Sequence, residues 1–199
     1  MLKWRYLSKL ARRRPTLVFL SRFHAGTLPR WVPAGARTVI ELGVDEVFRA
    51  AGGASRAEIP PPVAIFASNP ERGLGELLDL WADAIRPQVP DAVLRLHTGA
   101  GLYGPGVAGA GPAVAAVLDR ARSLSGAGVV LGEMLARPTL ARAFTTARVM
   151  LYPGDRREAF CLAVAEAQAT GLPAVVYARG ALPERVADGT SGSVARDPA

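Results

Sequence analysis

The chain has 199 residues, of which 50% are hydrophobic and 21% charged, so it carries enough apolar material for a core and is not a disordered protein. Its formal net charge of +7 suits an anionic partner, which leaves nucleic acid, a lipid surface and phosphorylated small molecules as candidates. A single cysteine, Cys161, excludes an internal disulfide and a multi-cysteine zinc site and agrees with a cytoplasmic location, and no apolar run reaches the ~18 residues of a membrane span.

The first fourteen residues have the pattern of a basic amphipathic helix. Tyr6, Leu7 and Leu10 fall on one face at helical spacing, while six Lys and Arg side chains fall largely on the other. The helix either packs its apolar stripe on the strand after Pro15, as most amphipathic helices do, or lies on anionic lipid at the inner face of the membrane. In the second case residues 1–14 form a peripheral membrane contact. The few aromatic residues of this segment argue against nucleic acid as the partner.

Short apolar runs alternate with helical patterns from Thr16 onward. The sequence predicts strands over residues 16–20, 38–42, 63–67, 92–97, 128–132, 148–152 and 174–178. It predicts helices over 73–86, 112–123, 137–146 and 160–170, the last closed by Gly171 and Pro173. Because strands that alternate with helices form parallel sheets covered on both faces, we expect an α/β fold with a doubly wound, Rossmann-like parallel sheet.

A break in this pattern falls at residues 43–62, which have little periodicity and end in three consecutive prolines. We interpret this segment as a linker between two domains. Residues 1–42 are too few to bury a core of their own, so we expect them to be the remnant of one domain. Residues 63–199 then form most of a second domain, which is incomplete at its C-terminal end.

The segment after the first strand of the main domain is a candidate phosphate site. In doubly wound folds, ligands bind at the carboxyl ends of the strands. Arg72 and Gly73 lie there, at a strand-to-helix turn, where a guanidinium can meet a phosphate near helical amides. Alternatively, Arg72 only pairs with Glu71 or Glu76 at the start of the helix.

The glycines after the second strand have the G-x-G-x-x-G spacing of dinucleotide sites, at Gly99, Gly101 and Gly104. The next helical pattern does not open on this motif, however. In addition, no acidic residue ends the following strand at the distance of ~20 residues that such sites require. The sequence therefore disfavours NAD binding.

Two glutamates mark the segment YPGDRREAFCLAVAEAQATGLPAVVYA. Glu158 follows a strand and its Gly154 turn, and Glu166 is the only charged residue of an apolar helix. A buried carboxylate needs hydrogen-bond donors. Glu166 therefore accepts hydrogen bonds from buried groups or from the hydroxyl groups of a ligand, unless it points to solvent near the end of the helix.

A helix that starts near Ala159 presents the free amides of Ala159, Phe160 and Cys161 as a partly positive cup for a diphosphate. At a rise of about 1.5 Å per residue, Glu166 then lies roughly 12 Å beyond Glu158. This is close to the span from a transferred sugar across a diphosphate to a ribose. One site can therefore use both glutamates.

The two glutamates and the residues around them resemble glycosyltransferase family four, a GT-B group. Members of this family carry E-x7-E followed by a glycine, a Pro-Glu pair and a D-G-x-x-G segment, which here is GLPAVVYARGALPERVADGTSG. The stretches VIELGVD, SNPERGL and VVLGEMLARPTLARAFTTARVMLYPG are similar to further segments of the family. The resemblance covers about residues 38–197.

The resemblance implies a GT-B enzyme with two Rossmann-like domains. Such an enzyme transfers a sugar with retention from a nucleotide diphosphate sugar to an acceptor, here unidentified, and needs no obligatory metal or other cofactor. By the positions of the family, Glu158 is the catalytic residue that contacts the donor sugar, and Glu166 contacts the ribose. Arg72 and the amides of Phe160 and Cys161 bind the phosphates.

The same resemblance places Gly132 to Met134 against the base of the donor. One position departs from the family, since Ser68 or Asn69 stands where the first of two basic residues is expected. Arg72 is then the only basic side chain of that loop. This departure keeps a second hypothesis open, in which the chain is a non-catalytic module that binds a nucleotide sugar or a phosphate.

Overall fold

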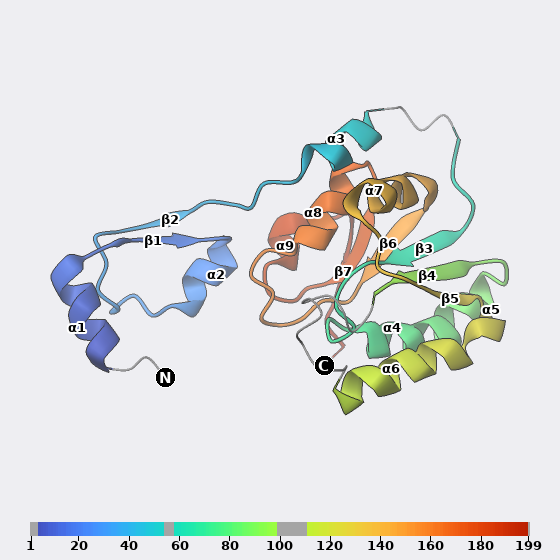
Figure 1. Ribbon diagram of the computed structural model, residues 1–199, viewed down its shortest axis with the longest axis horizontal. Helices are drawn as coiled ribbons and strands as arrows, with labels where there is room; N and C mark the ends of the chain where they lie inside the picture. The colour runs from blue at the N-terminus through green and yellow to red at the C-terminus, as the bar shows by residue number, and fades with distance from the viewer. Residues whose placement is uncertain (1–3, 54–57, 99–110, 199) are drawn as a thin grey trace.

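The computed structural model describes residues 4–53, 58–98 and 111–198, and these residues form two units (Figure 1). A small N-terminal unit is joined to a larger α/β domain by an extended segment of the chain. The glycines Gly99, Gly101 and Gly104 lie outside the described residues. Within the part of the chain that is described, no helix is long and apolar enough to cross a membrane.

The N-terminal unit consists of two helices and a two-stranded parallel sheet. Its elements are α1 (Trp4–Arg13), β1 (Thr16–Phe19), α2 (Arg22–Thr27) and β2 (Ala36–Val39). Strand β2 lies earlier than the predicted range 38–42, because its partner β1 has only four residues and pairs from Thr16 with Ala36 to Phe19 with Val39. The sequence did not predict α2. Its N-cap is Ser21, whose hydroxyl oxygen accepts the N–H of His24 at 2.9 Å.

The main domain is built on a six-stranded parallel sheet. Its strands are β3 (Val63–Phe66), β4 (Val93–His97), β5 (Val129–Gly132), β6 (Val149–Tyr152), β7 (Ala174–Tyr177) and β8 (Gly192–Ala195). Their order in the sheet is β5-β4-β3-β6-β7-β8. The first five agree with the predicted ranges to within one residue, whereas β8 was not predicted. The order and the parallel pairing confirm the predicted α/β fold with a doubly wound sheet.

Helices cover both faces of this sheet (Figure 1). One face carries α4 (Leu74–Leu80), which continues through a π-helical turn (Trp81–Ile85) into α5 (Arg86–Gln88), and α6 (Pro112–Ser123). The other face carries α3 (Glu46–Gly52), α7 (Arg137–Thr146) and α8 (Leu162–Ala169). A short 3-10 turn (Ser125–Ala127) precedes β5, and α9 (Leu182–Arg185) lies between β7 and β8. Helices α6 and α7 have the predicted bounds.

The segment that we predicted as a linker contains helix α3. Asp45 caps this helix by accepting the N–H of Val47, and Phe48 is fully buried. The ring of Phe48 lies against Phe144 of α7, with 6.0 Å between the ring centroids. The pattern missed α3 because seven residues give only about two turns of periodicity. Helix α3 packs with the main domain, while the domain boundaries themselves stay a prediction.

Two side chains of the main domain join it to the N-terminal unit. The carboxylate of Glu184 accepts the backbone N–H of Phe23 at 2.6 Å and that of Arg22 at 2.9 Å, and so caps the start of α2. The next residue, Arg185, forms an ion pair with Glu41 at 2.9 Å. Both contacts come from α9, directly beyond the carboxyl end of β7.

Candidate active site

The order of the strands reverses between β3 and β6. From β3 the chain continues to β4 and β5 on one side, and it then returns to β6, β7 and β8 on the other. The loops after β3 and β6 therefore leave neighbouring strands in opposite directions. Doubly wound folds bind their ligands in the crevice that such a reversal opens at the carboxyl ends of the strands.

The loops that border this crevice lie in close contact. Gly73 ends the loop after β3 with a φ of +89°, and a Cβ atom at this position would lie 2.7 Å from the Cβ of Pro153 in the loop after β6. Only glycine satisfies both the backbone conformation and this approach. The loop after β4 reaches the same edge, since the hydroxyl of Thr98 donates a hydrogen bond to the carbonyl of Ser68.

Glu158 is held at the centre of this edge. Its Oε2 atom accepts a hydrogen bond of 2.7 Å from the hydroxyl of Tyr152 and lies 3.6 Å from Nη1 of Arg72. Its carbonyl oxygen accepts the N–H of Ala181 at 2.8 Å, and Gly180 packs so closely that a Cβ there would lie 2.5 Å from the same oxygen. The side chain is only 12% exposed. The structure thus brings two of the predicted residues, Glu158 and Arg72, into contact.

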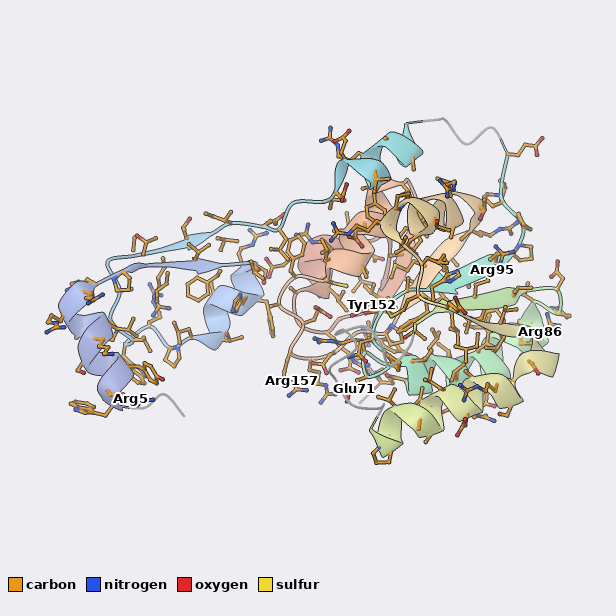
Figure 2. All side chains as sticks on the ribbon, in the orientation of Figure 1. Arg5, Glu71, Arg86, Arg95, Tyr152 and Arg157 are labelled. Atoms are coloured by element: carbon orange, nitrogen blue, oxygen red, sulfur yellow. The ribbon has the colours of Figure 1, made fainter. Side chains whose placement is uncertain are left out.

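Arg72 borders a polar cavity of 370 Å³ at the mouth of this crevice, lined by Asn69, Glu71, Arg72, Asp155 and Arg157. Figure 2 shows Glu71 and Arg157 on the same side of the domain. Nη1 of Arg72 lies 3.7 Å from Oδ1 of Asp155. The backbone N–H of Arg157, which donates to Asp155, lowers the pKa of that carboxyl. The cavity therefore holds two guanidinium groups beside an ionised carboxylate.

Helix α8 starts later than the sequence predicted, at Leu162 instead of near Ala159. The carbonyl of Glu158 accepts the N–H of Ala181, outside the helix, so residues 158–160 are drawn out of helical hydrogen bonding. Cys161 is the N-cap and has a left-handed backbone with a φ of +66°. The free amides at the helix start are therefore those of Cys161 and the residues after it, and those of Ala159 and Phe160 lie ahead of the helix.

The side chains of Phe160 and Cys161 face the interior of the domain. Phe160 is 3% exposed, and the guanidinium of Arg185 lies over its ring at 4.3 Å. Burial raises the pKa of the Cys161 thiol to about 12. The thiol therefore stays protonated at neutral pH, so Cys161 is a packing residue and only its backbone can serve a ligand.

Glu166 is half-buried near the middle of α8. Among the described residues its carboxylate accepts no hydrogen bond. Its pKa is raised by burial, lowered by the charge of Arg137 and raised by that of Asp45, with burial as the largest of these effects. Arg137 and Asp45 themselves form an ion pair of 3.0 Å. Glu166 thus lies beside α3 and the start of α7 and does not contact Glu158 or Arg72.

The residues predicted to lie against the base are at the far edge of the sheet. Gly132 ends β5 opposite His97 of β4. Nδ1 of His97 lies 3.2 Å from the carbonyl of Glu133, and because a carbonyl only accepts, this nitrogen must carry the proton. Burial lowers the pKa of His97, which favours the neutral ring. Met134 is exposed.

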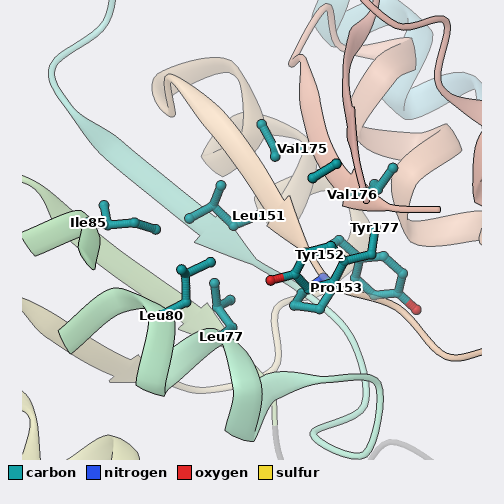
Figure 3. Close-up of a pocket in the computed structure, with 10 residues that line it drawn as sticks. Leu77, Leu80, Ile85, Leu151, Tyr152, Pro153, Val175, Val176 and Tyr177 are labelled. Carbon is teal, nitrogen blue, oxygen red and sulfur yellow. The ribbon is translucent and has the colours of Figure 1, made fainter. Parts of the chain in front are cut away.

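Tyr152, Asp155 and Gly180 shape the site but were not among the predicted residues. Tyr152 is the last residue of β6, and its inward position is visible in the alternating burial of that strand. Its ring also borders an apolar cavity of 280 Å³ on the other side of the loop (Figure 3). The predicted site residues do not line that cavity. Gly180 and Tyr152 carry no charge at neutral pH, so a search for charged residues passes over them, whereas Asp155 was available to such a search and was missed.

Several solved structures, among them glycosyltransferases, are similar to this chain in fold. One is a glycosyltransferase from Rickettsia africae (TM-score 0.74, 12% identity, 100% of this chain and 54% of that one). A second is sucrose-phosphate synthase from Thermosynechococcus elongatus (TM-score 0.68, 22% identity, 92% of this chain and 46% of that one). A third is HepE from Anabaena, solved with UDP and glucose (TM-score 0.70, 16% identity, 97% of this chain and 52% of that one). At such identities the likeness shows the fold alone. The chain spans about half the length of these structures.

The sequence itself matches a family profile over most of the main domain. No protein of curated function matches it. Residues 62–199, however, match the profile described as glycosyl transferases group 1. The match includes β3, β6 and α8, and with them the crevice, Arg72 and both predicted glutamates. The chain belongs to the group 1 glycosyl transferases.

Proposed function

We propose that this chain contains the donor-binding portion of a retaining GT-B glycosyltransferase of family four, which transfers a sugar from a nucleotide diphosphate sugar to an acceptor. The observation that carries the proposal is the contact between Glu158 and Arg72 at the strand-order reversal, directly ahead of the start of α8. At this place the carboxylate suits the sugar of a sugar diphosphate, and the guanidinium suits its phosphates. The bond that reacts joins the sugar to the phosphate.

The phosphates are assigned to Arg72 and to the first amides of α8. A guanidinium forms charged hydrogen bonds with phosphate oxygens, and the free N–H groups at Cys161 and beyond carry the positive end of the helix dipole. Both groups stabilise the negative charge that develops on the leaving diphosphate. Because Ser68 or Asn69 stands where the family has a basic residue in this loop, Arg72 neutralises the phosphates without a second cation from residues 67–73.

Glu158 is assigned to the sugar. Its carboxylate lies 3.6 Å from Arg72, and in this position it orients the sugar hydroxyls or stabilises positive charge on the reacting carbon. Glu166 is assigned to the ribose, and Gly132 and Met134 to the base. These residues lie at the carboxyl edge of the sheet or on α8, as a donor stretched along that edge requires. The absence of an obligatory metal remains part of the proposal.

The matched structures support a nucleotide sugar as ligand. HepE was solved with UDP and glucose, and the pneumococcal O-GlcNAc transferase GtfA with UDP and GlcNAc. A second candidate function is a non-catalytic nucleotide-sugar-binding module. The loss of a basic residue at Ser68 or Asn69 favours this alternative, since it weakens phosphate neutralisation. Transfer of a sugar to any acceptor excludes it.

The test is calorimetric titration of the folded chain with UDP, GDP, ADP and their glucose conjugates, repeated on Glu166→Ala. Removing an acceptor of charged hydrogen bonds should weaken nucleotide binding by about 1 to 3 kcal/mol. Glu46→Ala, on the exposed surface of α3, is the matched control. If the wild-type chain binds a nucleotide saturably and Glu166→Ala weakens that binding, the donor site is supported and the bound nucleotide identifies the base. If Glu166→Ala and Glu46→Ala bind the nucleotide with equal affinity, the assignment of Glu166 is contradicted.

Helix α1 supports a second proposal, peripheral contact with an anionic membrane from the cytoplasmic side. None of its residues is buried, and Trp4 is 81% exposed on the same helix as the basic side chains Arg5 and Lys9. Aromatic and basic side chains on one short helix suit a lipid interface. Sedimentation with vesicles that contain anionic lipid, but not with neutral vesicles, is the expected result. Loss of this binding in Trp4→Ala and Lys9→Glu would confirm that α1 carries it.

A further inference from the structure

We infer that Tyr152 is a positioning residue that fixes the orientation of the Glu158 carboxylate toward the donor sugar. The inference rests on the proposed function, because it concerns how one residue of that site is held. The hydroxyl of Tyr152 donates to Oε2 of Glu158 at 2.7 Å, a short distance typical of a hydrogen bond to a carboxylate.

The bond from Tyr152 fixes the end of a side chain whose backbone is already fixed. The N–H of Glu158 donates to the carbonyl of Asp155 at 3.0 Å, and its carbonyl accepts the N–H of Ala181 at 2.8 Å. Gly180 packs against the same residue. The only freedom left lies in the side-chain torsions, and the contacts of Oε2 with Tyr152 and Arg72 restrict these.

Arg72 alone is a poor anchor for this purpose. Its Nη1 lies 3.6 Å from Glu158 and 3.7 Å from Asp155, which are distances of ion pairs and not of close hydrogen bonds. In the proposed function Arg72 also turns to the phosphates when the donor binds. Tyr152 then provides the contact that holds the carboxylate while the guanidinium is engaged elsewhere.

The anchor itself is rigid. Tyr152 ends β6, beside the strand-order reversal, and is 2% exposed. Its ring stacks on Phe66 of β3, with 6.0 Å between the centroids and 23° between the planes. Figure 3 shows it next to Pro153, at the point where the strand ends. A group that belongs to the sheet is held more precisely than one on a loop.

The hydroxyl can only act as a donor to the carboxylate. Burial raises the pKa of Tyr152, and the neighbouring Cys161 and Glu158 raise it further, against a smaller opposite effect of a hydrogen bond with Ser68. Tyr152 therefore stays protonated at neutral pH. It neither accepts a proton nor carries charge in the reaction, which is why its role is to position Glu158.

Tyr152→Phe tests the inference, because it removes the hydroxyl and keeps the ring that packs on Phe66. The measured quantity is the affinity for UDP-glucose or UDP-N-acetylglucosamine divided by the affinity for UDP. Both affinities are obtained by calorimetry. We expect the affinity for UDP to stay within about twofold of wild type and the ratio to fall about fivefold or more, as for one lost hydrogen bond to a charged group. Tyr177→Phe, at the end of β7, should leave both quantities unchanged.

Glu158→Gln and the double variant complete the cycle. If Tyr152 acts through Glu158, adding Tyr152→Phe to Glu158→Gln should lower the ratio no further. A wild-type ratio in Tyr152→Phe, together with a reduced ratio in Glu158→Gln, overturns the inference and leaves the proposed function intact. An equal loss of affinity for UDP and for the sugar conjugates also overturns it, since that result marks a purely structural role. A wild-type chain that binds none of the three probes contradicts the proposed function itself.

Discussion

Nη1 of Arg72 lies 3.6 Å from Oε2 of Glu158, so the basic side chain of one loop faces the carboxylate of another across the strand-order reversal. The two residues are 86 positions apart in the sequence (158 minus 72). The sheet order β5-β4-β3-β6-β7-β8 brings them together, because it places the strands that precede them side by side. In the proposed function, this contact lies where the phosphate and the sugar of the donor meet.

Replacing Arg72 with glutamine should lower the affinity for UDP about tenfold or more, because charged hydrogen bonds to phosphate contribute about 1.5 to 3 kcal/mol. Arg72→Lys should retain part of the affinity, since it keeps the charge and loses the two-pronged geometry. Calorimetry at low salt measures both. Arg49→Gln, on the exposed side of α3, provides the control for the loss of one positive charge. Equal UDP binding by wild type and Arg72→Gln would show that phosphate binds elsewhere.

The sequence predicted the sheet more accurately than its surroundings. Strands β3 to β7 are short apolar runs with turn residues on both sides, so their positions follow from hydrophobicity alone. Strand β8 (GSVA) and helix α9 (LPER) have four residues each, too few for a pattern. Helix α3 was missed for the same reason, although Phe48 places it firmly in the core.

For the candidate site, the sequence pointed to two charged residues that lie close together, but it did not indicate the hydrogen bonds around them. Charge and spacing pointed to Glu158 and Arg72, and the structure brings these two into contact. The start of α8 was predicted three residues too early, since the bond from Ala181 to the Glu158 carbonyl joins segments that are distant in the sequence.

Glu166 should affect stability and binding in opposite directions. Burial raises its pKa above the usual value of 4.5, so the folded chain binds more protons than the unfolded chain at pH values just above that value. Stability then falls as the pH rises through this window, because the charged form is disfavoured in the fold. Glu166→Gln should therefore melt at a higher temperature than wild type at pH 7, with little difference near pH 4, while it binds UDP more weakly.

Melting curves of Glu166→Gln and Glu46→Gln at several pH values measure this effect. Glu46 lies on the exposed side of α3, so its replacement should not give the same pH-dependent gain. A stabilised variant that has lost affinity is the pattern expected of a residue kept for binding. If Glu166→Gln is less stable than wild type at pH 7, the carboxylate has a stabilising partner and the sign derived from its burial is wrong.

Cys161 should tolerate glycine better than alanine. Its φ of +66° is strained for any residue with a Cβ atom, at a cost of about 1 to 2 kcal/mol, whereas glycine adopts it freely. Both replacements remove the buried thiol, and their difference reports the backbone strain less the contribution of about 0.8 kcal/mol from the one buried methyl group that alanine keeps. We expect Cys161→Gly to be about 1 kcal/mol more stable than Cys161→Ala in urea unfolding.

The opposite order should hold within a regular helix. At Ala141, in the interior of α7, replacement by glycine should destabilise by about 1 kcal/mol. The pair of experiments therefore separates backbone strain from general intolerance of glycine. A Cys161→Gly variant that is less stable than Cys161→Ala would show that the left-handed turn before α8 does not persist in solution.

Arg179 joins three parts of the main domain in one buried ion cluster. Its side chain is 10% exposed, and its Nη1 and Nη2 donate to the two carboxylate oxygens of Glu76 on α4 at 2.7 and 3.1 Å. Nη2 also donates to Asp197 after β8 at 2.6 Å, and the guanidinium lies 4.7 Å from the ring centre of Tyr177. The hydrogen bonds that Arg179 donates to Asp197 and, to a smaller extent, to Glu76 raise the pKa of Arg179, so it stays charged.

Arg179→Met should destabilise the chain by about 2 to 4 kcal/mol, because removing one partner of a buried ion pair leaves an uncompensated charge. The partial exposure of Glu76 reduces the cost of that charge. Urea unfolding measures the change, and Arg122→Met, which breaks an exposed pair with Asp119, should stay within about 0.5 kcal/mol of wild type. Adding Glu76→Gln to Arg179→Met should restore part of the loss, since it removes a carboxylate that has lost its cation. An unchanged unfolding midpoint in Arg179→Met would mean that the segment after β8 and helix α4 are held by their apolar contacts alone.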